Sequence, residues 1–173
     1  MNFLEQLTAE WYSHMGYFVR TNIKYGRRTR GGYEGEMDVI AYHPQSLTLL
    51  HIETSMDADS WDKRMIKFKR KFDTANKYYN KLFKFDIKKV EWMVIVGSNP
   101  PRKDFFGKVA PVQSIPQFIE KVTDYLSQYH PFTNTIPENY PLLRAILFAI
   151  HYDKRIQYLL NKPNKKSKKI IEK

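Results

Sequence analysis

Apolar residues recur at the spacing of an α-helix in several parts of the chain. The segments with this spacing are residues 3–15, 59–82, 114–129 and 141–160. Gly16 suits the end of the first helix, and Pro141 suits the first position of the last. In the second segment the apolar face carries Trp61, Met65, Phe68, Phe72 and Tyr79. These four segments are therefore predicted to be helices.

Strands are predicted between these helices, where apolar residues alternate or run together. The candidate strands are residues 17–25, 36–42, 47–55 and 90–98. The second and third flank the sequence HPQS, which predicts a hairpin turn, and the fourth is apolar on both faces, which favours a central place. The pattern predicts an α/β fold with a mixed four- to five-stranded sheet flanked by helices. We expect a core over residues 1–130, a linker and C-terminal helical extension over 131–160, and a basic, disordered tail over 161–173.

The charge balance favours an anionic partner. The 173 residues include 29 Lys and Arg against 18 Asp and Glu, a net charge of +11. A polyphosphate backbone is the commonest partner of such a surplus, although charge that serves only solubility would give the same count. The sequence shows no apolar run long enough to span a membrane and no signal peptide at its start, so a cytoplasmic protein is expected. The absence of cysteine excludes disulfides and thiolate zinc sites.

Acidic residues stand inside the two apolar runs of the predicted hairpin. Alternation puts Glu36 and Asp38 on one face of the first strand, and His51 and Glu53 on one face of the second. If HPQS forms the turn, Asp38 opposes His51 and Glu36 opposes Glu53, so that Asp38 lies diagonal to Glu53. Buried carboxylates are costly unless a cation meets them, and a hard divalent cation such as magnesium prefers oxygen ligands. The alternative is a solvated hairpin face.

The sequence GEMDVIAY…LLHIETS, after the helix LEQLTAEWYSHMGYFV, resembles the PD-(D/E)XK nuclease superfamily. It is similar in layout to the restriction-endonuclease-like and resolvase-like members over roughly residues 3–100. The resemblance implies a Mg²⁺- or Mn²⁺-dependent endonuclease with Asp38 and Glu53 as metal ligands, and it favours double-stranded DNA over RNA as the substrate. It also implies that Glu5, eleven residues before Gly16, holds a metal-bound water or a second ion.

One position departs from the family pattern. Ser55 stands where the lysine of the E-x-K motif is expected, and a serine carries no charge. The resemblance implies that the following helix can supply the basic group instead, with Arg64 favoured and then Lys67. The alternative is a decayed domain that binds nucleic acid without cleaving it.

Three further features of the sequence each allow two interpretations. His51 is either a general base or metal ligand, or a histidine hydrogen-bonded to a neighbour such as Asp38. The loop GRRTRGG, with Arg27, Arg28 and Arg30, is either a phosphate clamp or a solvated loop, and the tail adds Lys165 and Lys166 to the basic residues that could contact a nucleic acid. The apolar face of the last helix either caps the core or forms a homodimer interface; its residues are Leu143, Ile146, Leu147 and Ile150.

Overall fold

The computed structural model describes residues 2–57, 59–97, 110–153 and 158. The chain divides into two compact units, Met1–Val122 and Thr123–Lys173. The candidate site and the sheet belong to the first unit. Lys165 and Lys166, which the sequence places among the basic residues of the tail, lie outside the described residues.

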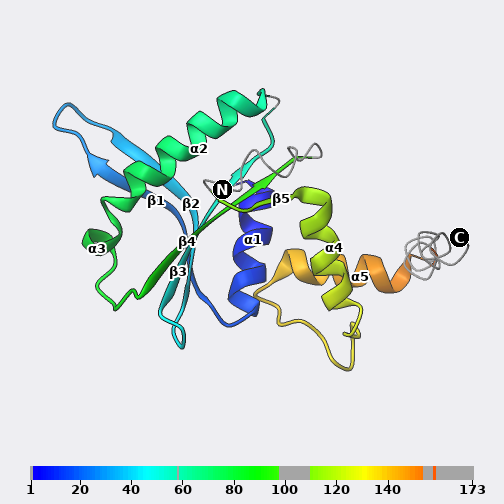
Figure 1. Ribbon diagram of the computed structural model, residues 1–173. Helices are drawn as coiled ribbons and strands as arrows, with labels where there is room; N and C mark the ends of the chain where they lie inside the picture. Colours follow the sequence, from blue (N-terminus) through cyan, green and yellow to red (C-terminus); the bar gives the residue numbers. More distant parts are fainter. Residues whose placement is uncertain (1, 58, 98–109, 154–157, 159–173) are drawn as a thin grey trace, which may run out of the picture. The chain divides into compact units, whose positions relative to one another are not determined.

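The first unit is built on a five-stranded mixed sheet, as the sequence predicts (Figure 1). Its strands lie side by side in chain order: β1 (Phe18–Arg27), β2 (Tyr33–His43), β3 (Thr48–Ser55), β4 (Lys89–Val96) and β5 (Val112–Ser114). β1, β2 and β3 pair antiparallel, whereas β4 and β5 each pair parallel to the preceding strand. The central β3 therefore has a neighbour on both sides, and its interior residues are buried.

The predicted register of the β2–β3 hairpin is wrong by two residues. Tyr42 pairs with Leu49 and Ile40 with His51, and the last pair before the loop is His43 with Thr48. The loop therefore lies one residue further along the chain than HPQS, and Leu47 adopts a positive φ of 53° within it. Because the shift is an even number, every side chain keeps its predicted face. Only the partners across the hairpin change.

Five helices accompany the sheet in the described part of the chain: α1 (Phe3–His14), α2 (Trp61–Asn76), α3 (Tyr79–Leu82), α4 (Ile115–Leu126) and α5 (Pro141–Tyr152). The single helix predicted over residues 59–82 is broken. The N–H groups of Lys77 and Tyr78 bond to carbonyls three residues back, which tightens the last turn of α2 before α3 begins. Tyr79, which the sequence places on the apolar face of this segment, opens α3 and is 2% exposed.

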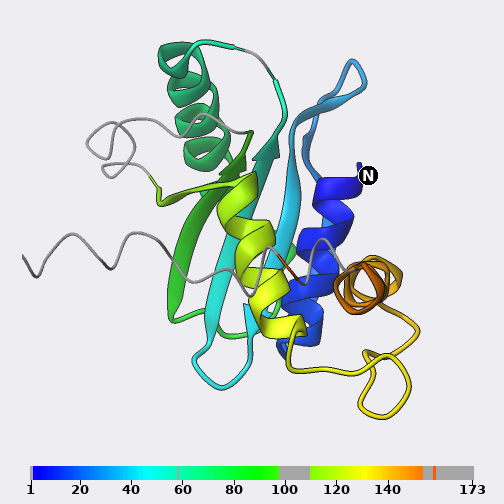
Figure 2. The same ribbon diagram turned by 90° about the vertical axis from the view of Figure 1, so that its right-hand side faces the viewer.

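The two faces of the sheet are covered by different helices (Figure 2). On one face lies α1, whose Tyr12 hydroxyl contacts Met93 Sδ of β4 at 3.4 Å. On the other lies α2, where Phe72 meets the His51 ring edge-on at 4.9 Å and stacks on Trp92 at 5.0 Å. The acidic face of β2 and β3 is thus the face beneath α2.

The second unit contains α5 and the segment that leads to it. Arg144 donates to the carbonyl of Ile136 at 3.1 Å, which ties the start of α5 to that segment. Of the apolar residues on this helix, Leu143, Leu147 and Ile150 are buried, in line with a role in packing. Among the residues that the structure describes, no helix has the length and apolar character needed to cross a membrane.

Candidate functional site

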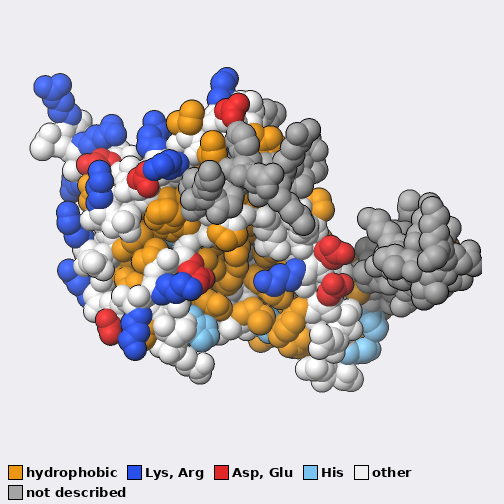
Figure 3. All heavy atoms as spheres, viewed as in Figure 1, with side chains coloured by type: hydrophobic (Ala, Val, Ile, Leu, Met, Phe, Trp, Pro, Cys, Tyr) orange, Lys and Arg blue, Asp and Glu red, His pale blue; other side chains and the backbone are white. Residues whose placement is uncertain are grey.

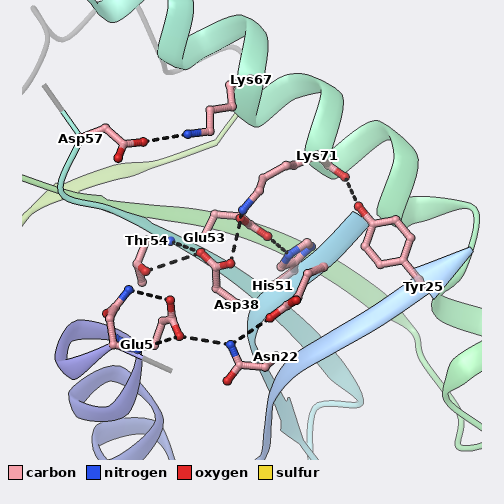
Figure 4. A network of polar contacts seen from close by, with 12 residues as sticks. Glu5, Asn22, Tyr25, Asp38, His51, Glu53, Thr54, Asp57, Lys67 and Lys71 are labelled. Atoms are coloured by element: carbon pink, nitrogen blue, oxygen red, sulfur yellow. Dashed lines mark hydrogen bonds and ion pairs between the residues drawn. The ribbon is translucent and has the colours of Figure 1, made fainter. Parts of the chain in front are cut away.

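Asp38 of β2 and Glu53 of β3 lie beside each other, and both carboxylates contact the ammonium group of Lys71 (Figure 4). Continuing the observed register by one pair places Asp38 directly opposite Glu53, closer than the predicted diagonal. The ammonium of Lys71, on α2, lies 3.3 Å from Asp38 Oδ1 and also donates to Glu53 Oε2. The Glu53 side chain is fully buried, whereas those of Asp38 and Lys71 are 13% and 27% exposed. The cluster therefore opens to solvent on the Asp38 and Lys71 side.

The backbone of β3 holds the second oxygen of Asp38. Thr54 donates to Oδ2 from its N–H at 2.9 Å, and its hydroxyl lies 3.5 Å from the same atom. Burial and the nearby Glu53 raise the pKa of the Asp38 carboxyl to about 6, although Lys71 and the Thr54 N–H act in the opposite direction. Asp38 is thus ionised at neutral pH and takes up a proton in mildly acidic solution.

Glu53 ends a chain of buried hydrogen bonds that runs through His51. Glu53 Oε1 lies 2.7 Å from His51 Nε2, and His51 Nδ1 lies 2.7 Å from the Tyr79 hydroxyl, to which Trp92 donates at 3.2 Å. Indole N–H can only donate and a carboxylate can only accept. All the groups are satisfied if Tyr79 donates to Nδ1 and a neutral His51 donates from Nε2 to Glu53. The carboxylate partner of His51 is therefore Glu53, and not Asp38 as the sequence suggested.

The charges of this cluster stabilise one another. Burial disfavours the charged form of Glu53, but the hydrogen bond from His51 and the contacts with Lys71 together hold the pKa of Glu53 below its usual value. Burial likewise disfavours a charged Lys71, but the two carboxylates raise the pKa of its ammonium. With a neutral His51, two carboxylates and one ammonium leave a net charge of −1 in the cluster. That excess favours a further cation or a proton.

Glu5 lies at the same end of the sheet but is held by other partners. It forms a capping box with Asn2 at the start of α1, and its Oε2 also accepts from Asn22 Nδ2 at 3.2 Å. On β1, the residues before and after Asn22 pair with the residues after and before Asp38 on β2, so Asn22 lies across from Asp38. Asn22 also donates to Glu36 at 3.0 Å. Glu5 and Glu36 therefore share Asn22, while Asp38 and Glu53 share Lys71.

The basic residues favoured by the sequence have other contacts. Lys67 forms a 2.7 Å ion pair with Asp57, in which both side chains are about half exposed. Arg64 is buried and its guanidinium lies 4.8 Å from the centre of the Trp61 ring. Ser55 ends β3 and accepts from the N–H of Asp57 at 3.2 Å, which shapes the chain after the strand.

Lys71, Tyr79 and Trp92 are the residues of this cluster that sequence reasoning did not assign to the site. A signal for Lys71 exists in the helical spacing. It lies three residues after Phe68 and four before Ala75, both of which α2 buries against the sheet. The expectation that the first turns of the helix would lie nearest the acids favoured Arg64 instead.

The carboxylate pair meets the chemical requirement of a magnesium or manganese site in part. Mg²⁺ is commonly held by one or two carboxylates, with water and substrate phosphate completing its ligands. Asp38 and Glu53 supply hard oxygen donors that already converge on a cation. In the described part of the chain, no three His, Asp or Glu side chains gather as a metal-binding group. Asp38 and Glu53 would therefore be the residues that coordinate an ion bound here.

Comparison with known proteins adds no family to these observations. No protein-family model matches the chain, and none of the curated proteins or solved structures matches it.

Proposed function

We propose that the protein is a metal-dependent endonuclease that hydrolyses phosphodiester bonds of nucleic acid in the cytoplasm, with double-stranded DNA as the favoured substrate. The observation that carries the proposal is the convergence of Asp38 and Glu53 with Lys71 at a partly open point of a basic protein. Two adjacent carboxylates and an ammonium are groups that can hold a hard cation and a phosphate side by side.

Asp38 and Glu53 are the residues that would hold Mg²⁺ or Mn²⁺. When bound, such an ion polarises a phosphoryl oxygen and lowers the pKa of a coordinated water. His51 keeps the Glu53 carboxylate oriented, because its Nε2 holds Oε1 and leaves Oε2 on the Lys71 side. The Thr54 N–H does the same for Asp38, because it holds Oδ2 and leaves Oδ1 on the Lys71 side.

Lys71 takes the place of the positive charge that Ser55 does not provide. Its ammonium is partly exposed and adjoins both carboxylates, so it can contact a phosphate oxygen and offset negative charge that develops there. Arg64 and Lys67 are engaged elsewhere and have no such role in this proposal. Glu5 acts from a greater distance by orienting Asn22 beside Asp38.

A non-catalytic DNA-binding or regulatory module is the second candidate, and one observation favours it. Lys71 already neutralises much of the carboxylate charge, so the survival of Asp38 and Glu53 does not by itself require a metal. In that case the basic residues would bind nucleic acid, and the ion-paired cluster would serve the fold.

A titration and a substrate panel separate the two candidates. Manganese binding to the wild-type protein, measured by calorimetry, should disappear in Asp38→Asn and in Glu53→Gln. Supercoiled plasmid, linear duplex, branched DNA and RNA should then be incubated with Mg²⁺, with Mn²⁺ or with a chelator. Metal-dependent cleavage of any of these supports the nuclease. Binding of DNA with neither metal uptake nor cleavage supports the module.

A further inference from the structure

A cleft of about 610 Å³ lies next to the carboxylate cluster, between α2 and the hairpin of β1 and β2. That volume is within the usual range of roughly 300–1,000 Å³ for ligand sites. Lys71 belongs to both the cleft and the cluster. The cleft is also lined by Tyr25, Arg28, Glu34, Gly35, Glu36 and Arg70. Whatever fills the cleft therefore lies against the same ammonium that meets Asp38 and Glu53.

Hydrogen bonds and one close approach of side chain to backbone hold the walls of the cleft in place. The Tyr25 hydroxyl donates to the backbone carbonyl of Lys71 at 3.4 Å, which joins β1 to α2 at the floor of the cleft. Gly35 allows this approach, because a side-chain carbon there would collide with the Tyr25 hydroxyl. On the other side, the hairpin loop is closed by hydrogen bonds from Arg28 N to Gly32 O at 3.0 Å and from Gly31 N to Arg28 O at 3.1 Å.

Most charged groups in the cleft already have partners. Lys71 is bound to the two carboxylates, and Glu36 accepts from Asn22 at 3.0 Å. Glu34 lies near the Tyr78 hydroxyl and raises the pKa of that phenol. Arg28 and Arg70 differ, since within the described residues neither guanidinium lies within ion-pair distance of a carboxylate. Both are exposed, and Figure 3 shows Lys and Arg side chains gathered over the hairpin and α2.

We propose that Arg28 and Arg70 bind the sugar–phosphate backbone of a nucleic-acid strand next to the phosphate that meets Lys71, an inference that rests on the proposed function. A guanidinium presents a planar fork of donors that matches phosphate oxygens, and it keeps its charge at every physiological pH. One arginine comes from the hairpin and the other from α2, so a strand in the cleft is held from both walls. Of the three arginines in the loop, only Arg28 lines the cleft.

Binding measured without metal tests this assignment separately from catalysis. A fluorescently labelled DNA duplex is titrated with wild type, Arg28→Ala, Arg70→Ala and the double variant at several salt concentrations. Each single variant should bind about five- to tenfold more weakly, and each lost phosphate contact should lower the salt slope by about 1. Arg28→Lys and Arg70→Lys should recover part of the affinity, because they restore the charge but not the fork.

Matched controls remove one positive charge elsewhere on the same elements. Arg20→Ala on β1 and Lys63→Ala on α2 are exposed positions outside the cleft and should change affinity less than about twofold. If Arg28→Ala and Arg70→Ala weaken binding no more than these controls, the cleft assignment is wrong even if the protein cleaves DNA. If they weaken binding as expected but no metal-dependent cleavage is found, the cleft assignment stands and the nuclease proposal falls.

Discussion

Lys71 of α2 donates to Glu53 of β3, which lies 18 residues earlier in the chain and is fully buried, with His51 as its other hydrogen-bond partner. The contact joins a helix to the centre of a sheet through an ion pair with Asp38 as its third member. Buried carboxylates need such a partner, and removal of one member leaves the others without compensation.

Lys71→Met should therefore abolish cleavage and destabilise the fold. The two carboxylates would face each other, and we expect the free energy of unfolding to fall by about 1.5–3 kcal/mol, because hydrogen bonds to charged groups are lost. Lys69→Met on the same helix breaks only an exposed pair with Asp73 and should cost no more than about 0.5 kcal/mol. Urea unfolding of the three proteins measures the difference. Loss of cleavage in Lys67→Met with activity retained in Lys71→Met would contradict the role given to Lys71.

The raised pKa of Asp38 predicts a specific dependence of stability on pH. The folded protein holds this proton up to about pH 6, whereas an unfolded chain releases it near 3.8. The folded state thus binds more protons in between, so the contribution of Asp38 to stability falls as the pH rises through this window. Two pKa units correspond to at most about 3 kcal/mol. The difference in unfolding free energy between wild type and Asp38→Asn, measured from pH 4 to pH 7, should decline by an amount of this order; a flat difference would show that the carboxyl titrates normally.

The same titration should appear in activity. Asp38 must be ionised to hold a cation, so cleavage by the wild type should rise as the pH increases through about 6. Cleavage should therefore rise with pH while the contribution of Asp38 to the free energy of unfolding falls, because both depend on the ionisation of the same carboxyl.

Tyr79→Phe tests the buried hydrogen-bond chain. The change removes one oxygen and leaves His51 Nδ1 and Trp92 Nε1 without their partner, which should cost about 1–3 kcal/mol. Tyr33→Phe, at an exposed position, should stay within about 0.5 kcal/mol of wild type. If thermal unfolding shows equal stability for the two variants, the Tyr79 hydroxyl does not support His51 in the way the geometry indicates.

The sequence alone predicts the class of fold and the face of the sheet that carries the acids. Alternation along β2 and β3 is enough for this, because a register error of two residues leaves each side chain on its face. It does not identify Lys71, since the choice among the basic residues of α2 depends on where the helix axis crosses the sheet. It places Tyr79 on the apolar face of the helix but does not identify the Tyr79 hydroxyl as a partner of His51, because it does not predict the break between α2 and α3.

The basic tail gives a prediction from sequence alone. Deletion of the residues after Leu160 removes six lysines, including Lys165 and Lys166. DNA binding should weaken and its salt slope should become less steep, because fewer counterions are released, while cleavage persists. Filter binding at several salt concentrations measures the slope. A truncated protein with unchanged slope would show that the tail does not contact DNA.

The measurement that tests the central claim most directly is magnesium-dependent cleavage of DNA by wild type, Asp38→Asn and Glu53→Gln, with DNA binding measured in parallel. We expect cleavage by the wild type only, and equal or tighter binding by the two variants, because each removes a negative charge that repels phosphate. Glu91→Gln, at an exposed position on β4, serves as the matched control and should cleave as the wild type does. If the wild type cleaves no nucleic acid with Mg²⁺ or Mn²⁺, or if the two variants cleave as well as it does, Asp38 and Glu53 are not the active site.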